Sequence, residues 1–214
     1  MKVSPKWFAV ALGTVTILAV FALVLGTPSA TASDIRVACI GDSITSDTEY
    51  TDDLSSMLGE NYTVGNFGVG RTTVSLQFNK PYMNQPAFQD AQRFNPDIVV
   101  IMLGTNDAYL TEQQRSNFVN DYKALINSFS SLPSNPEVYI VVPPPVFKNT
   151  MGLQAEVLDN NVIPLVSQTA TDLGLPRIDV HTPLLDNPED FQDGVHPNVI
   201  GSQVIASEIY NALT

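Results

Sequence analysis

The feature that most constrains the fold is a regular alternation of short apolar runs with longer amphipathic segments. Residues 97–103, DIVVIML, form the clearest run. It is continuous, branched and apolar, as expected of a central strand buried on both faces. Four further strands are predicted at residues 35–40, 62–67, 137–143 and 177–180. Helices are predicted at residues 51–58, 86–94, 111–129, 154–173 (with Pro164 as a candidate kink) and 198–213. This order predicts a three-layer α/β/α sandwich around a five-stranded parallel sheet.

The N-terminal 32 residues have the layout of a secretory signal peptide. Lys2 and Lys6 precede an apolar run at 7–25, and Ala30-Thr31-Ala32 forms a cleavage pattern before Ser33. The run of about 19 residues is also long enough for an uncleaved membrane anchor. We therefore predict a signal peptide or N-terminal anchor at 1–32 and one exported domain at 33–214, with membrane contact only through an uncleaved first segment.

The composition of residues 33–214 excludes several function classes. These 182 residues suit one domain with a sizeable core. They hold eight basic and 22 acidic residues, a formal charge of −14, which repels nucleic acids and anionic membranes. Cys39 is the only cysteine, so no intrachain disulfide forms, and its apolar setting favours a small hydrophobic role. With only His181 and His196 besides, a zinc site has too few good ligands.

The segments that follow the predicted strands carry the polar residues of interest. They read GDSIT, GVGRTT, GTNDAY and PPPVF, and FQDGVHPN precedes the last helix. In an open α/β sheet, ligands bind beyond the carboxyl ends of the strands. Function is therefore expected in these segments.

Together these segments hold the parts of an ester hydrolase. Ser43 needs a base to become a nucleophile, and His196 is the candidate. Asp193, three residues earlier, suits the orientation of the imidazole. The backbone N–H groups of Ser43 and Gly70 and the amide of Asn106 are candidate donors to an oxyanion.

The sequence resembles the SGNH hydrolases, also called GDSL esterases and lipases. Four blocks match in family order: GDSIT (41–45), NFGVGRTT (66–73), GTND (104–107) and DGVHPN (193–198). The resemblance implies a flavodoxin-like sheet, Ser43 as nucleophile, His196 as base and Asp193 as its orienting partner. It also implies an oxyanion hole from the Ser43 and Gly70 backbones and the Asn106 side chain.

Two departures from the family pattern affect the site. Ser46-Asp47-Thr48 stands where the family often has a glycine, and Asn66 lies one residue closer to Gly70 than usual. Gly68 therefore stays open as an alternative oxyanion donor. Residues beside the motifs are candidates for substrate contact: Asp42, Arg71, Asp107 and Tyr109. His181 is interpreted as structural or as part of the rim.

Within the family, the chain looks most like bacterial carbohydrate O-acetylesterases, including sialate-type ones. This finer resemblance implies hydrolysis of small acyl groups on a small-molecule or glycan ester, through an acyl-serine intermediate, with no metal or organic cofactor. Export fits a secreted enzyme that meets glycans outside the cell.

Three alternatives remain open at this stage. A lysophospholipase or thioesterase would use the same residues on longer acyl chains. A non-catalytic flavodoxin-like protein would hold a phosphate at the SITSDT segment, with Ser43 as a simple helix cap. A glycan-binding protein of hydrolase descent would lack turnover although its set of reactive residues is intact. Taken alone, Asn106-Asp107 is also typical of an ordinary turn after a strand.

Overall fold

The computed structural model describes Met1 and residues 34–214 of the chain. The signal or anchor segment predicted at 1–32 lies, beyond Met1, outside the described residues. In the described part, no helix combines the length and the apolar character needed to cross a bilayer.

A five-stranded parallel sheet forms the centre of the domain. Its strands are β1 (Ile35–Gly41), β2 (Tyr62–Gly68), β3 (Ile98–Met102), β4 (Glu137–Val142) and β5 (Arg177–Asp179). All four pairings are parallel, in the order β2-β1-β3-β4-β5. The predicted sheet is therefore confirmed, with the strand order of flavodoxin-like folds and a switch point beside β1.

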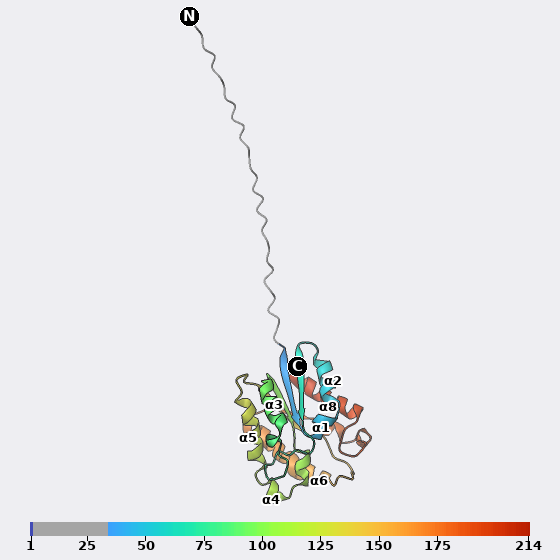
Figure 1. The fold of residues 1–214 in the computed structure, drawn as a ribbon. Coiled ribbons are helices and arrows are strands. Elements are labelled where there is room, and N and C mark those ends of the chain that lie inside the picture. Colours follow the sequence, from blue (N-terminus) through green and yellow to red (C-terminus); the bar gives the residue numbers. More distant parts are fainter. Residues whose placement is uncertain (2–33) are drawn as a thin grey trace. The chain divides into compact units, whose positions relative to one another are not determined.

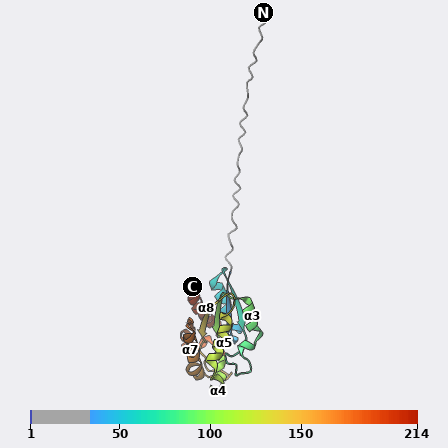
Figure 2. The same ribbon diagram turned by 90° about the vertical axis from the view of Figure 1, so that its left-hand side faces the viewer.

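Helices cover both faces of the sheet (Figure 1). They are α1 (Ser43–Asp47), α2 (Tyr50–Leu58), α3 (Pro86–Phe94), α4 (Glu112–Arg115), α5 (Phe118–Ser130), α6 (Ala155–Val157), α7 (Ile163–Leu173) and α8 (Val199–Leu213). Short 3-10 turns lie at η1 (Tyr82–Asn84), η2 (Thr105–Tyr109), η4 (Thr182–Leu184) and η5 (Pro188–Asp190), and η3 (Leu158–Val162) is a π-helical turn. Figure 2 shows α5 between α3 and α7 on one face.

Alternation along the strands divides the apolar residues between two cores. Successive side chains of a strand point to opposite faces. Ala38 and Ile40 of β1 therefore pack with residues of α3, α5 and α7, whereas Val37 and Cys39 pack with residues of α2 and α8. Burial raises the pKa of the Cys39 thiol to about 12, so the thiol stays protonated and serves as a small buried side chain, as predicted.

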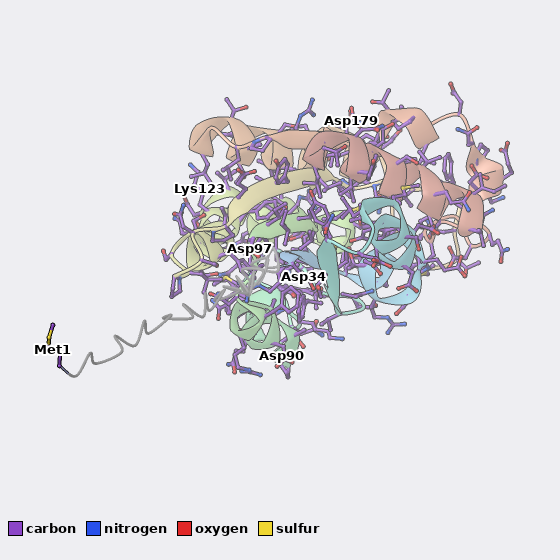
Figure 3. The ribbon with its side chains drawn as sticks, turned by 90° about the horizontal axis from the view of Figure 1, so that it is seen from above. Met1, Asp34, Asp90, Asp97, Lys123 and Asp179 are labelled. Atoms are coloured by element: carbon purple, nitrogen blue, oxygen red, sulfur yellow. The ribbon has the colours of Figure 1, made fainter. Side chains whose placement is uncertain are left out.

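An ion pair joins β1 to β3 at the end of the sheet opposite the carboxyl ends. Asp97, labelled in Figure 3, accepts hydrogen bonds from the backbone N–H and from Nε of Arg36 at 2.8 and 3.3 Å. This contact fixes the start of β3 beside β1. The opposite ends of the same strands carry the motif residues.

Two predicted helices differ from the structure. Residues 111–129 form α4 and α5, interrupted at Ser116 and Asn117, because the side chains of serine and asparagine bond locally to the backbone and neighbouring groups. The capping box predicted from Thr111 and Gln114 is present. The predicted helix 154–173 is divided into α6, the π-helical turn η3 and α7, and α7 begins beside the predicted kink at Pro164, since proline lacks the N–H that a regular helix requires.

Candidate active site

Ser43 follows β1 directly, at the start of α1. Gly41 ends the strand, and a Cβ at this glycine would lie 1.8 Å from Thr45 Oγ1, so the tight approach requires glycine. Asp42 caps α1, and its Oδ1 accepts the Ile44 N–H at 3.0 Å. The local sequence Gly-Asp-Ser thus turns the chain sharply and holds the serine beyond the sheet edge.

His196 and Asp193 reach Ser43 from the segment before α8. The Ser43 hydroxyl lies 2.8 Å from His196 Nε2, and His196 Nδ1 lies 2.7 Å from Asp193 Oδ2. Asp193 Oδ1 also accepts the backbone N–H groups of Val195 and His196. Burial acts to raise the pKa of Asp193, but the bonds from His196 and these N–H groups lower it below its ordinary value. The structure thus brings together three side chains that sequence reasoning grouped.

Gly70 and Gly68 occupy different environments beside Ser43. Gly70 lines the pocket, and a Cβ placed on it would lie 3.7 Å from Ser43 Cβ. The N–H of Gly68 instead donates to Asn66 Oδ1 at 3.0 Å. A Cβ on Gly68 would lie 2.3 Å from the Ser46 nitrogen, so Gly68 packs against α1 and stands outside the pocket lining. Of the two candidate donors, Gly70 is the one that faces the serine.

A tight turn carries Gly70 to this position. The Thr72 N–H donates to the Val69 carbonyl at 3.3 Å, and the Val69 N–H donates to the Gly41 carbonyl at 3.0 Å. Arg71 takes a left-handed φ of 65°, which is unfavourable for a residue with a Cβ. Lys80 Nζ donates to the Gly70 carbonyl at 2.7 Å. The turn is therefore tied to β1 and to the following loop.

Asn106 lies in η2, just after β3, and joins the first two motif loops. Its Nδ2 donates to Asp42 Oδ2 at 3.2 Å and to the Thr72 carbonyl at 3.1 Å. The side chain is 6% exposed and lines the pocket with Ser43. Its amide is therefore fixed in orientation next to the serine by two acceptors of the protein.

The structure does not bring Asp42 and Asp107 to the pocket lining. Both are buried, and Asp107 accepts the backbone N–H groups of Val74 and Ser75 at 2.9 and 3.0 Å. Burial raises the pKa of Asp42 to about 6 and that of Asp107 to about 7. These carboxyl groups hold the motif loops together, a placement different from the substrate contact predicted for them.

A pocket of about 730 Å³ opens beside Ser43, His196, Gly70 and Asn106. Arg71 and Tyr109, the other candidates for substrate contact, line it. Asp47, part of the departure from the family pattern noted after the first motif, also lines the pocket, whereas sequence reasoning missed four lining residues: Phe78, Met151, Leu153 and Val195. The Tyr109 hydroxyl donates to the Met151 carbonyl at 2.9 Å, which joins two walls. The sequence predicted a site beyond the carboxyl ends of the strands, but it did not identify these individual side chains.

His181 lies away from this pocket. Its Nδ1 is 3.0 Å from the Pro143 carbonyl and its Nε2 is 3.5 Å from Asp159 Oδ1. This buried setting agrees with the structural interpretation of His181. Within residues 34–214, no three His, Cys, Asp or Glu side chains form a group suited to a metal ion.

Comparison with known proteins identifies relatives of the chain. Residues 39–204 match the GDSL-like lipase/acylhydrolase family. The chain is 33% identical to an acetylxylan esterase of Xylanibacter ruminicola over 213 residues, which cover 87% of this chain and 44% of the relative. It is 26% identical to a multidomain esterase of Ruminococcus flavefaciens over 117 residues, 51% of this chain and 14% of the relative. The chain thus spans less than half the length of these curated relatives.

Solved structures share the fold. An acetyl xylan esterase superposes with a TM-score of 0.69 at 24% identity, covering 84% of this chain and all 100% of that chain. A carbohydrate acetylesterase from Sinorhizobium meliloti gives a TM-score of 0.63 at 18% identity, covering 84% and 98%. These matches confirm the predicted fold. The family match covers most of the described residues and includes all four motif blocks, so the chain belongs to the GDSL-like lipase/acylhydrolase family, a family of carboxylic ester hydrolases.

Proposed function

We propose that residues 33–214 form a secreted serine esterase that hydrolyses small acyl esters, chiefly acetyl esters, on carbohydrates. The observation that carries this proposal is the continuous contact from Ser43 through His196 to Asp193, at 2.8 and 2.7 Å. A serine hydroxyl is a weak nucleophile until a base accepts its proton, and this chain of contacts supplies the base and its orienting group.

The proposed reaction proceeds through an acyl-serine intermediate. His196 Nε2 accepts the Ser43 proton while Oγ attacks the ester carbonyl, and the developing oxyanion accepts hydrogen bonds from the backbone N–H groups of Ser43 and Gly70. The Asn106 amide, which already donates to Asp42 and Thr72, is shared with the oxyanion. The imidazolium then protonates the leaving alcohol. Water, activated by the same histidine, releases the acid and restores Ser43.

The carbohydrate substrate is supported by the 33% identical relative, an acetylxylan esterase. The pocket of about 730 Å³ also has room for the ester group and the part of the sugar next to it, since small-molecule sites span about 300–1,000 Å³. The signal segment predicted at 1–32 supports export to where such polymers occur. Arg71 and Tyr109, which line the pocket, are proposed to contact the substrate.

A second candidate is hydrolysis of esters with longer or aromatic acyl groups. The observation in its favour is the apolar wall of the pocket, formed by Phe78, Met151, Leu153 and Val195. Such a wall stabilises a longer hydrocarbon chain by about 0.8 kcal/mol for each methylene that it buries.

Hydrolysis of p-nitrophenyl esters from acetate to decanoate tests both candidates. Wild type is compared with Ser43→Ala and with Ser56→Ala, a serine on the exposed side of α2. The proposal predicts highest kcat/KM at acetate, near-complete loss in Ser43→Ala and no change in Ser56→Ala. A maximum at long chains would favour the second candidate, and activity retained in Ser43→Ala would refute the acyl-serine mechanism. N-terminal sequencing of protein from the culture medium tests export, with Ser33 as the expected first residue.

A further inference from the structure

A second, polar groove adjoins the reactive histidine. Its volume is about 320 Å³, and it shares Asp47 and His196 with the pocket beside Ser43. The two hollows therefore meet at His196, the residue that protonates the leaving alcohol in the proposed reaction. We call this second hollow the acidic groove, defined by Asp47, Glu49, Gln192, Asp193, Val199 and Ser202.

The side chains of the acidic groove suit hydroxyl groups. The carboxylates of Asp47 and Glu49 are acceptors, and the amide of Gln192 offers both donors and an acceptor. Glu49 and Gln192 are exposed. A sugar ring presents several hydroxyl groups at its edge, so it matches a groove that holds such acceptors and donors on opposite sides.

Ser202 supplies an independent indication of a ligand. The residue is 1% exposed, lies in the lining of the groove, and its Oγ has no hydrogen-bond partner in the described part of the chain. Buried hydroxyl groups are normally paired, and an unpaired one destabilises the structure. A ligand hydroxyl that enters the groove is therefore proposed to pair with it.

The groove also offers an apolar contact. Val199 lines it and remains 52% exposed, and the neighbouring Ile200 is 60% exposed. A sugar ring has an apolar face of C–H groups besides its polar edge. An exposed valine beside acceptor groups therefore complements both sides of a sugar better than it complements an ion or a hydrocarbon chain.

We propose that the acidic groove binds the sugar part of the ester and selects neutral sugars over anionic ones. This inference rests on the proposed esterase function and deepens it. The leaving oxygen must reach His196 Nε2, and the sugar that carries it then extends across His196 into the groove. The acyl group stays beside Ser43 and Gly70 in the larger pocket.

Charge gives the groove its selectivity. Three carboxylates line it, those of Asp47, Glu49 and Asp193, and no lysine or arginine does so within the described residues. A carboxylate on the bound sugar would lie against these groups, and two like charges about 4 Å apart in water cost about a fivefold loss in binding. Arg71, a cation, lines the larger pocket and not the groove. Uronates and sialates are therefore expected to be poor substrates.

The test compares two acetylated sugars that differ by one carboxylate. The substrates are an O-acetylated methyl xyloside and an O-acetylated methyl glucuronide, with p-nitrophenyl acetate as a substrate that has no sugar. Wild type should favour the xyloside by about fivefold or more in kcat/KM. Glu49→Gln should lower kcat/KM on the xyloside by about tenfold, which corresponds to the loss of one hydrogen bond to a charged group. The same variant should show a smaller preference for the xyloside over the glucuronide. Activity on p-nitrophenyl acetate should not change.

Two further variants complete the test. Glu112→Gln, which removes an exposed carboxylate from α4, is the matched control and should behave as wild type. Ser202→Ala should lower activity on the xyloside alone, independently of Glu49. The proposal that the acidic groove binds the sugar would be overturned if the two sugars reacted at equal rates and Glu49→Gln had no effect. The proposed esterase function would not be affected by that result. An equal loss on p-nitrophenyl acetate would also overturn the proposal that the groove binds the sugar. Absence of Ser43-dependent turnover on p-nitrophenyl acetate would instead overturn the proposed function.

Discussion

Gly68 and Gly70 lie two residues apart, yet alanine should destabilise the fold at Gly68 and leave it unchanged at Gly70. A Cβ on Gly68 would meet the backbone of Thr45 and Ser46 at 2.7 and 2.3 Å, which only a shift of α1 relieves. We expect Gly68→Ala to lower the free energy of unfolding by about 1–3 kcal/mol, the cost of overpacking. At Gly70 the nearest atoms lie at 3.7 and 3.9 Å, so Gly70→Ala should fold as wild type. Urea denaturation of both variants checks this, and equal destabilisation would contradict it.

Lys80 is a positioning residue for the turn beside Ser43. Its Nζ donates to the Gly70 carbonyl at 2.7 Å and so holds the peptide after Gly70, which shares the Gly70 Cα with the peptide that carries the proposed donor N–H. We expect Lys80→Met to lower kcat on p-nitrophenyl acetate by about tenfold with KM unchanged, because a misplaced oxyanion donor acts on the transition state. Lys80→Arg should restore part of the rate, and Lys148→Met, at an exposed lysine, should have no effect. A change in KM alone would show that Lys80 acts on substrate binding instead.

At the scale of elements, the cap of α8 lies next to His196, the proposed base. Asn198 caps this helix two residues after His196, and its Oδ1 accepts the N–H groups of Ile200 and Gly201 at 2.9 and 3.1 Å. We expect Asn198→Ala to lower the free energy of unfolding by about 1 kcal/mol and also to lower kcat. Thr111→Ala removes the cap of α4 and is the matched control, with a loss of stability but full activity. Thermal unfolding and steady-state kinetics of both variants test this prediction. An unchanged kcat in Asn198→Ala would show that the cap of α8 does not contribute to activity.

The elements also show what the sequence could predict. The five strands were predicted within about two residues at each end, since continuous branched runs such as 98–102 are a strong local signal. The four motif blocks led to Ser43, His196, Asp193 and Asn106, because the carboxyl ends of parallel strands converge at one edge. Periodicity could not reveal the interruption between α4 and α5, which depends on local side-chain bonds of Ser116 and Asn117, or the π-helical form of the turn η3 before Pro164. Nor could it show that Asp42 and Asp107 point inward, since a buried carboxylate depends on backbone donors supplied by distant loops.

At the scale of the whole molecule, two buried carboxyl groups make stability depend on pH. The pKa of Asp42 is raised to about 6 and that of Asp107 to about 7 by burial, above the ordinary value of 3.8. Between about pH 4 and pH 7 the folded protein therefore binds more protons than the unfolded chain, so the free energy of unfolding falls as the pH rises. Above about pH 8 both groups are ionised in both states, and the slope disappears.

We therefore expect the melting temperature to be higher at pH 5 than at pH 8. The acidic surface should change stability with pH in the same direction. Residues 33–214 carry a formal charge of −14, and their carboxylates repel one another more strongly when all of them are ionised. Below about pH 4 the trend should reverse, since Asp193, whose pKa is lowered in the folded state, stabilises the fold only while it is ionised. Calorimetry from pH 3 to pH 8 measures the melting temperature as a function of pH.

The variant Asp42→Asn tests the contribution of one of the two carboxyl groups. It should reduce the slope of the free energy of unfolding against pH, between pH 4 and pH 6, by the equivalent of about one proton. The asparagine cannot titrate but can still cap α1. A melting temperature that rises steadily from pH 5 to pH 8 would show that Asp42 and Asp107 do not control the pH dependence of stability.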